Sequence, residues 1–297
     1  MKFDKPSLTN KAHIDLLSKR GLRIEDPDKA LRCIEFIGYF RLSGYFHYFL
    51  QDDKKEHIFK AETSFDDVIN IYSFDRKLRA LLLLQLEKVE VAFRAVISDS
   101  MSEIDGAHWY MDGRHFHDSK FFSHSRFMQD ISTEVDRKKK TTFVKHYLEK
   151  YDTPKLPPSW MVFELVSFGL VVTLYKHLNA RLKKHICKRF QLPPYILANW
   201  MENCNSLRNM CAHHERVWNA KFIKKPSFKS VANITDLDIP SEKKLYAQLF
   251  MLQKLLDVIH PDASFKKELK DLLECYSSIP TKDMGFPENW KHEEVWN

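Results

Sequence analysis

The sequence predicts an all-α protein, a helical bundle with helical additions at its N- and C-terminal ends. Only 7 of the 297 residues are glycine, which argues against Rossmann and P-loop folds because their phosphate-binding turns need glycine. Long segments rich in Leu, Lys, Glu and Phe follow one another, with helix caps and stops between them. No alternating strand pattern persists long enough to indicate a sheet.

The N-terminal part of the chain predicts three helices. The first is capped by Thr9 or Ser7 and runs to Lys19, before Gly21. The second has Asp26 as its N-cap and Pro27 as its first residue, and it stops near Gly38. Residues 39–45 are expected to form a compact aromatic connector. A long helix is then predicted over 64–104, where neither Gly nor Pro occurs. Because this is long for a globular helix, we expect it to bend or to be two helices end to end.

The rest of the chain alternates breaks and helical patterns. A loop with short helical pieces is expected over 105–124, followed by a polar helix that carries the basic run at 137–140. After a proline-rich break, periodic apolar residues predict helices over 160–178, 180–190, 193–218, 241–258 and 264–276. Residues 221–240 are expected to be irregular.

Composition bounds the class of protein. Apolar residues make up 44% of the chain, enough for a core, and 47 Lys and Arg against 40 Asp and Glu give a net charge of +7, which permits an acidic partner. Five scattered cysteines without a CxxC pair suggest reduced thiols in the cytoplasm. The first residues lack the apolar run of a signal peptide. The longest uninterrupted apolar run, 80–84, is too short for a membrane span. A cytoplasmic protein without membrane contact is therefore expected.

One segment gathers unusual chemistry. Residues 207–219, LRNMCAHHERVWN, hold two Arg, two His, two Asn and one Glu. Arg208 followed by His213 matches the R-x4-6-H signature of HEPN domains, which are helical domains of four to five helices. The match implies a HEPN-like bundle, and many HEPN proteins are metal-independent ribonucleases.

Three further blocks sharpen the resemblance. They are 38–45 (GYFRLSGY), 87–94 (EKVEVAFR) and 160–169 (WMVFELVSFG). Together with the Arg-His segment they resemble the abortive-infection (Abi) family of bacterial antiphage proteins, in its AbiD/AbiF-like branch. The resemblance covers roughly residues 5–222 and does not extend into the C-terminal part. We predict an N-terminal helical extension over 1–60, a HEPN-like core over 61–222 and a C-terminal helical segment and tail over 223–297.

The residue types in the Arg-His segment suit RNA cleavage. The 2′-OH of RNA is its own nucleophile, so the reaction needs a base, an acid and positive charge on the phosphorane. A His titrates near neutral pH, and an Arg offers a fixed fork of donors to phosphate. We predict that Arg208 and His213 form the catalytic pair, with Asn209 orienting the His or touching phosphate and the more inward His214 beside them.

Helix geometry qualifies this prediction. At 3.6 residues per turn, five steps rotate by about 140°, so Arg208 and His213 would lie on different flanks of one straight helix. A second copy of the motif across a two-fold axis would complete such a site, as the resemblance to HEPN dimers implies. The apolar stripe Leu207, Cys211, His214 and Trp218 is expected near that homodimer contact.

Structural alternatives stand beside the catalytic interpretation. Arg208 and His213 would equally form an ion-pair and hydrogen-bond cluster with Glu215, and His214 would be a core histidine. Cys204, Cys211 and His214 share a helical stripe that suggests zinc, but no fourth ligand lies nearby, so no metal and no cofactor is predicted. Supporting roles are assigned to three residues, namely Glu90, Arg94 and Arg216.

Three basic clusters flank the predicted site. They are either solvated faces or an RNA track, since phosphate neutralisation drives nucleic-acid affinity. The predicted RNA-binding residues are Arg137, Lys138, Lys139, Lys140, Lys183, Lys184, Lys188, Arg189, Lys221, Lys224 and Lys225. The sequence thus predicts an antiphage, HEPN-type endoribonuclease toxin associated with a structured noncoding RNA. The alternative is a catalytically silent RNA-binding scaffold or a phage-sensing adaptor.

Overall fold

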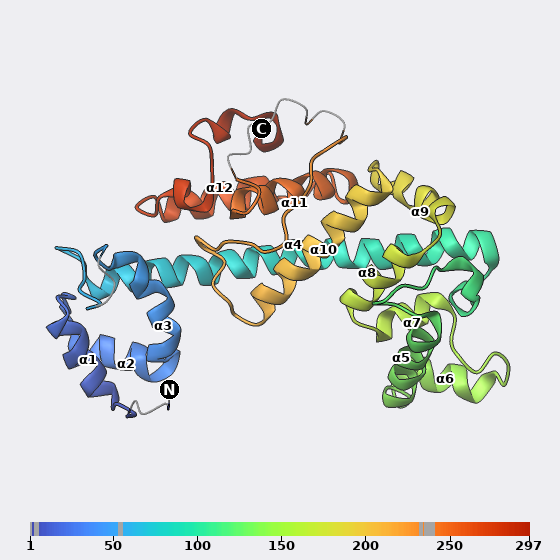
Figure 1. Cartoon of the computed structure of the whole chain (residues 1–297), viewed down its shortest axis with the longest axis horizontal. Coiled ribbons are helices and arrows are strands. Elements are labelled where there is room, and N and C mark those ends of the chain that lie inside the picture. The colour runs from blue at the N-terminus through green and yellow to red at the C-terminus, as the bar shows by residue number, and fades with distance from the viewer. Residues whose placement is uncertain (1, 3–5, 53–55, 232–233, 235–240) are drawn as a thin grey trace. The chain divides into compact units, whose positions relative to one another are not determined.

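The computed structural model describes residues 2, 6–52, 56–231, 234 and 241–297, and over these residues it holds twelve α-helices and no β-strand (Figure 1). The predicted all-α class is therefore confirmed. The chain divides into two compact units, one of Met1–Arg79 with Lys270–Pro280 and one of Ala80–Leu269 with Thr281–Asn297. The three-part division by motif stays a prediction.

The first unit contains three whole helices and parts of two others, namely α1 (Asn10–Lys19), α2 (Pro27–Ile37), α3 (Tyr39–Phe46), the start of α4 (Phe65–Asp105) and the end of α12 (Phe265–Cys275). Two predicted caps are confirmed. Thr9 Oγ1 accepts the backbone N–H of Ala12 at 3.2 Å, and Asp26 Oδ1 accepts that of Lys29 at 2.8 Å. These bonds satisfy donors that a helix start otherwise leaves without partners.

The aromatic connector predicted at 39–45 is instead a helix, α3. Its aromatic residues and Gly44 have modest helix propensity, but packing outweighs it, since Leu42, Tyr45 and Phe46 are buried. The Tyr45 hydroxyl donates to Asp75 Oδ2 at 2.6 Å and accepts from the Arg79 guanidinium, which also pairs with Asp75. Burial raises the pKa of the Tyr45 phenol, so the hydroxyl stays a donor.

Helix α4 begins at the predicted place and runs unbroken for 41 residues. Ser64 and Asp67 form a reciprocal capping box, because the Ser64 N–H donates to Asp67 Oδ2 at 2.8 Å and the Asp67 N–H donates to Ser64 Oγ at 3.1 Å. The helix ends at Asp105, before Gly106, whose φ of 75° suits glycine. The expected alternative of two helices end to end is therefore wrong.

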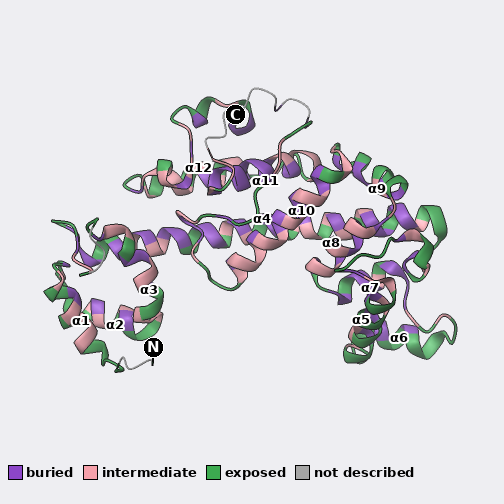
Figure 2. Ribbon diagram, in the orientation of Figure 1, coloured by how far each residue is buried: buried purple, intermediate pink, exposed green. Residues whose placement is uncertain are grey.

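The second unit is built around α10 (Pro194–Ala212), which packs against α8, α9 and α11. Figure 2 shows that α11 is buried along most of its length. The helices between α4 and α12 are α5 (His124–Arg137), α6 (Thr142–Lys150), α7 (Ser159–Leu165), α8 (Phe168–His177), α9 (Ala180–Cys187), α10 and α11 (Leu245–Ile259).

The single helix predicted over 160–178 is two helices. Val166 is extended, and Ser167 starts α8 by accepting the Leu170 N–H on its hydroxyl at 3.3 Å. The apolar periodicity continues across this serine cap, so it did not reveal the break between the two helices. Of the region predicted irregular, residues 221–231 contain no helix, while 232–233 and 235–240 lie outside the described residues.

The structure also bears on the cysteines and on membrane-spanning helices. None of the five cysteines forms a disulfide. No helix in the described part of the chain is both long and apolar enough to cross a membrane.

Candidate functional site

A cleft of about 600 Å³ lies in the second unit between α4, α5, the α7–α8 turn and α10. We call it the polar cleft. Its ionisable lining balances in charge, with four cations and four carboxylates, which are Arg94, Arg137, Lys138, Arg208, Glu90, Asp130, Glu134 and Glu164. It brings together six residues predicted from the sequence, namely Glu90, Arg94, Arg208, Asn209 and the predicted RNA-binding residues Arg137 and Lys138.

The Glu90–Arg94 pair forms the floor of the polar cleft. The two residues lie one turn apart on α4, and Arg94 Nε donates to Glu90 Oε1 at 3.2 Å. The side chain of Arg94 is only 12% exposed. Its guanidinium also donates to the Phe163 carbonyl and, at 3.0 Å, to the Val166 carbonyl. Arg94 therefore satisfies carbonyls that the end of α7 leaves without helical partners.

The α5 wall of the cleft repeats this arrangement. Lys138 donates to the Leu165 carbonyl, again at the end of α7, and lies 3.7 Å from Glu134. Arg137 pairs with the same Glu134 at 2.8 Å, with most of its side chain exposed. Lys138, predicted to bind RNA, is thus engaged within the protein. Lys139 and Lys140 follow as exposed residues.

Arg208 enters the cleft from α10. Its Nε lies 3.6 Å from Glu90 Oε2, and another of its nitrogens donates to Asn209 Oδ1 at 3.3 Å. The Arg208 side chain is 43% exposed. Glu90 thus links two arginines of unlike exposure, with Arg94 beneath it and Arg208 at the opening. The predicted supporting role of Glu90 and Arg94 has a geometric basis, which is the positioning of Arg208 and of the α7–α8 turn.

The helix predicted over 193–218 ends at Ala212, six residues early. The His214 N–H donates to the Cys211 carbonyl at 3.1 Å, and the Glu215 N–H donates to the Met210 carbonyl at 2.9 Å. This is a Schellman motif with His214 in the left-handed position at φ 60°. Glycine usually occupies that position, and histidine tolerates it better than most residues. The stop signal was therefore hidden from sequence analysis.

The early end changes the surroundings of both histidines. His213 and His214 are exposed, so the expectation of a more inward His214 is wrong. Neither residue lines the polar cleft, so the structure does not bring His213 into it beside Arg208. Arg216 follows the turn as a half-buried residue.

The four residues expected near a homodimer contact do not share one exposed helix face. Leu207, Cys211 and Trp218 are fully buried within the chain, while His214 is exposed. Burial also raises the pKa of the Cys204 thiol, which disfavours the thiolate that zinc requires. The buried residues belong to the core of the unit, and a contact between subunits would need another surface.

Several predicted RNA-binding cations already have partners inside the second unit. Lys183 donates to the Lys176 carbonyl at 3.0 Å, and Arg189 pairs with Glu103 at 3.0 Å. Lys224 lies 3.5 Å from Glu202 and Lys225 lies 2.6 Å from Glu242. Among the residues that the structure describes, five other predicted RNA-binding cations have no ion pair, namely Lys139, Lys140, Lys184, Lys188 and Lys221.

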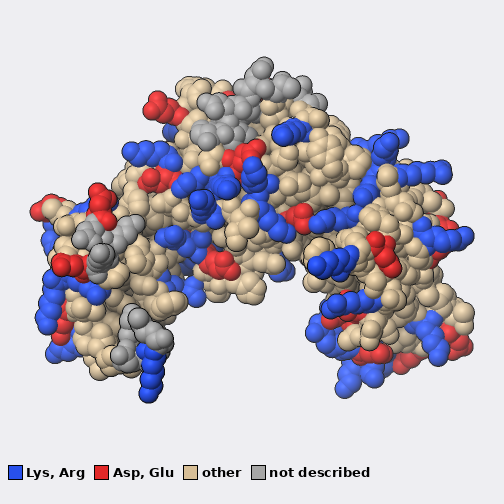
Figure 3. Space-filling model, viewed as in Figure 1, with Lys and Arg blue, Asp and Glu red and all other residues tan. Residues whose placement is uncertain are grey.

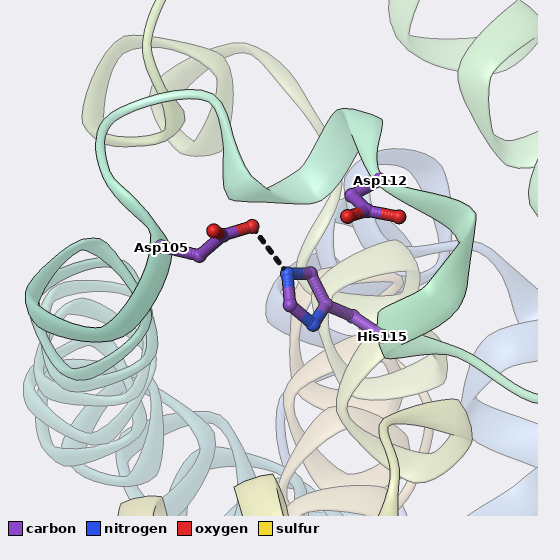
Figure 4. A group of neighbouring side chains, drawn as sticks. All are labelled: Asp105, Asp112 and His115. Carbon is purple, nitrogen blue, oxygen red and sulfur yellow. Dashed lines mark hydrogen bonds and ion pairs between the residues drawn. The ribbon is translucent and has the colours of Figure 1, made fainter.

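A second polar group lies at the end of α4. Figure 4 shows Asp105 and His115 facing each other, and His115 Nε2 lies 2.7 Å from Asp105 Oδ2. Asp112 completes the group, and one donor atom from each residue lies within 4.8 Å of the others. The Arg114 side chain donates to both oxygens of Asp112, and this contact and the N–H of Arg114 hold the pKa of Asp112 down at about 2. This group was not predicted from the sequence. Its contacts connect the end of α4 to the turns that follow it, which is a structural role.

Sequence analysis also missed the α5 carboxylates of the polar cleft. Asp130 and Glu134 lie four residues apart on one flank of α5, beside the buried face formed by Phe127, Ile131 and Val135. That spacing was visible in the sequence. What it could not indicate was that α5 faces Arg208 and Glu90, which are far away along the chain.

Comparison with known proteins supplies one match. The family model described as Abi-like protein matches residues 32–219, which is more than half of the chain. No curated protein and no solved structure matches the chain.

Proposed function

The chain belongs to the Abi-like protein family, and from this premise we propose that it defends its host against phage as a metal-independent endoribonuclease. Family membership by itself indicates a role in abortive infection. The finer proposal depends on one observation. Arg208 is held at the opening of the polar cleft by Glu90, and the exposed His213 follows it at the end of the same helix.

The proposed chemistry divides the work between these two side chains. His213, which is exposed, would take the proton of the 2′-OH or give one to the leaving 5′-oxygen. Arg208 would donate to the phosphate as its negative charge grows. Glu90 is a positioning residue, since its carboxylate limits where the Arg208 guanidinium can lie. Asn209 accepts from Arg208 and restrains it from a second side.

Two parts of the proposal concern partners. We propose that RNA is the substrate, with a structured noncoding RNA as a further, regulating ligand. We also propose a homodimer, because Arg208 lies on α10 and His213, its C-cap residue, follows five positions later and therefore about 140° further around the helix axis. Two copies facing each other across a two-fold axis would bring Arg208 of one copy near His213 of the other.

RNA cleavage in the presence of EDTA tests the activity. The purified protein should cut RNA without added metal and leave 2′,3′-cyclic phosphate ends. His213→Ala should lower the rate by about 10²–10⁴-fold, the usual value of one acid–base group. Arg208→Ala should lose a comparable factor and Arg208→Lys should not restore it, because a point charge cannot replace the guanidinium fork. His146→Ala, on an exposed position of α6, is the matched control and should leave the rate unchanged.

A second candidate, the catalytically silent RNA-binding scaffold, has an observation of its own. Neither His213 nor His214 lines the polar cleft, and two of its cations, Arg94 and Lys138, hold the carbonyls at the end of α7. A scaffold would bind RNA equally well before and after His213→Ala and would never cut it. That outcome would replace the endoribonuclease with the scaffold.

A further inference from the structure

The helix α9 separates its residues cleanly by polarity. Leu182, Ile186 and Phe190, the last in the short turn after the helix, are buried. The exposed face carries Arg181, Lys184, His185 and Lys188. These four positions follow the spacing i, i+3, i+4 and i+7, which places them on one face of a helix. Figure 3 shows basic side chains gathered on the surface over α9, at the upper right of the view.

The charges of this face are not neutralised by the protein nearby. Residues 165–201 contain no Asp or Glu. Glu103 reaches into the area from α4, but it pairs with Arg189 at 3.0 Å and lies 3.8 Å from His185. Over the described residues no ion pair involves Arg181, Lys184 or Lys188, which we call the α9 row.

The shape of the surface suits an extended polyanion. The α9 row, with Ala180 and His185, lines a shallow depression of about 470 Å³ that shares no residue with the polar cleft. At 1.5 Å of rise per residue, Arg181, Lys184 and Lys188 extend over about 10 Å along the helix axis. The row therefore presents several separate charges in a line, rather than one point of charge for a single small anion.

We infer that the α9 row binds the phosphate backbone of RNA, outside the polar cleft. The inference rests on the proposed function for the identity of the polyanion. Backbone contacts of this kind supply affinity and orientation without reading sequence, because every nucleotide carries the same phosphate. The row also selects among the predicted basic residues. It adds Arg181 and excludes Lys183 and Arg189, which already have partners in the chain.

The salt dependence of RNA binding tests the α9 row. For single strands the slope of log K against log[salt] changes by about 0.7 for each phosphate contact. The triple variant Arg181→Ala, Lys184→Ala, Lys188→Ala should therefore have a slope shallower by about 2. Between 50 and 200 mM salt, wild type should lose roughly 20-fold more affinity than this variant does. A single-stranded oligonucleotide of mixed sequence is the probe.

A matched triple variant controls for net charge. This control variant also removes three positive charges, but at positions whose cations already have partners in the chain, namely Lys183→Ala, Arg189→Ala and Lys225→Ala. Its slope should change by less than half as much. Equal slopes for the two triple variants, or no change in the α9 variant, would overturn the inference. The exposed positions of the α9 row make a loss of fold unexpected, and circular dichroism of both variants checks it.

Cleavage separates this inference from the proposed function. In EDTA, the α9 variant should need a higher oligonucleotide concentration than wild type to reach half of its maximal cleavage rate, in proportion to its weaker binding. Wild-type protein that binds RNA without cutting it would refute the endoribonuclease and leave the slopes to decide on the α9 row. Wild-type protein that binds no RNA would overturn both.

Discussion

The polar cleft and the α9 row are both rich in cations, yet the chain uses them differently. In the cleft, Arg94 and Lys138 hold backbone carbonyls at the end of α7, and Glu90 faces two arginines at once. On α9, three cations face outward with no ion pair among the described residues. A basic residue in a sequence is therefore ambiguous until its carboxylate and carbonyl neighbours are known. Arg94 and Lys138 of the polar cleft stabilise the fold, whereas the cations of the α9 row are available to bind a partner.

The largest test of this difference is Arg94→Ala. Removing the guanidinium leaves Glu90 partly buried without its close partner and frees the Phe163 and Val166 carbonyls. Breaking such a pair from one side should lower the free energy of unfolding by about 3 kcal/mol. Lys184→Ala on the α9 row is the matched control, and its exposed position predicts a change within about 0.5 kcal/mol. Urea unfolding followed by circular dichroism measures both. Equal stability of the two variants would mean that Arg94 does not hold the α7–α8 turn.

Much of the helix framework was predictable because its signals are local. The Thr9 and Asp26 caps, and the box formed by Ser64 and Asp67, are short sequence patterns that act within one turn. The polar cleft was predictable in part, since Glu90 and Arg94 lie one turn apart and Arg208 belongs to a recognisable motif. Its α5 wall was not, because contacts between α5 and α10 depend on tertiary packing.

Two errors have a common cause in the chemistry of helix ends. Ser167 begins a helix inside an apolar run, and His214 ends one without glycine. Periodicity shows which face of a segment is apolar, but it does not reveal a break whose signal is a single polar side chain. Both breaks lie beside the candidate site, so its outline could not be derived from periodicity alone.

The next largest effect concerns the turn after Arg208. A β-branched residue is strongly disfavoured at positive φ, so His214→Val should lower the free energy of unfolding by about 1 kcal/mol. His213→Val is the control at the neighbouring exposed position, where φ is −85° and the change should be smaller. Urea unfolding compares the pair. If His213→Val proved the more damaging, the Schellman motif would not be what ends α10.

The α9 row can also be extended by removing a carboxylate. Glu103→Gln should release Arg189 and weaken the hold on His185. If Arg189 then gains one phosphate contact, the salt slope should steepen by about 0.7 and affinity at low salt should rise roughly threefold. Glu288→Gln removes the same charge at an exposed position and should change the slope little. Fluorescence anisotropy of a labelled oligonucleotide measures both, and equal effects would indicate net charge rather than the row.

The smallest effect is expected at Glu202, which holds Lys176 at 2.7 Å and Lys224 at 3.5 Å. Burial would raise the pKa of this carboxyl, but the hydrogen bond from Lys176 and the two ammonium charges lower the pKa overall from its ordinary 4.5. A carboxyl with a lowered pKa binds fewer protons in the folded chain than in the unfolded one. Its contribution to stability is therefore present above about pH 4.5 and is lost as the pH falls through the folded pKa.

Glu202→Gln tests that sign. At neutral pH the wild type should be more stable than the variant by about 0.5 kcal/mol, as for a half-buried ion pair that solvent still screens. This difference in stability should shrink as the pH falls below 4.5, because Glu202 of the wild type then becomes protonated and loses its charge. The variant has no charge at this position at any pH. Combining Glu202→Gln with Lys176→Met should cost less than the sum of the two single changes if the pair carries the effect. A difference that grew on acidification would show that Glu202 is not an ion-pair partner of Lys176 and Lys224, and Lys224 would then join the cations available to RNA.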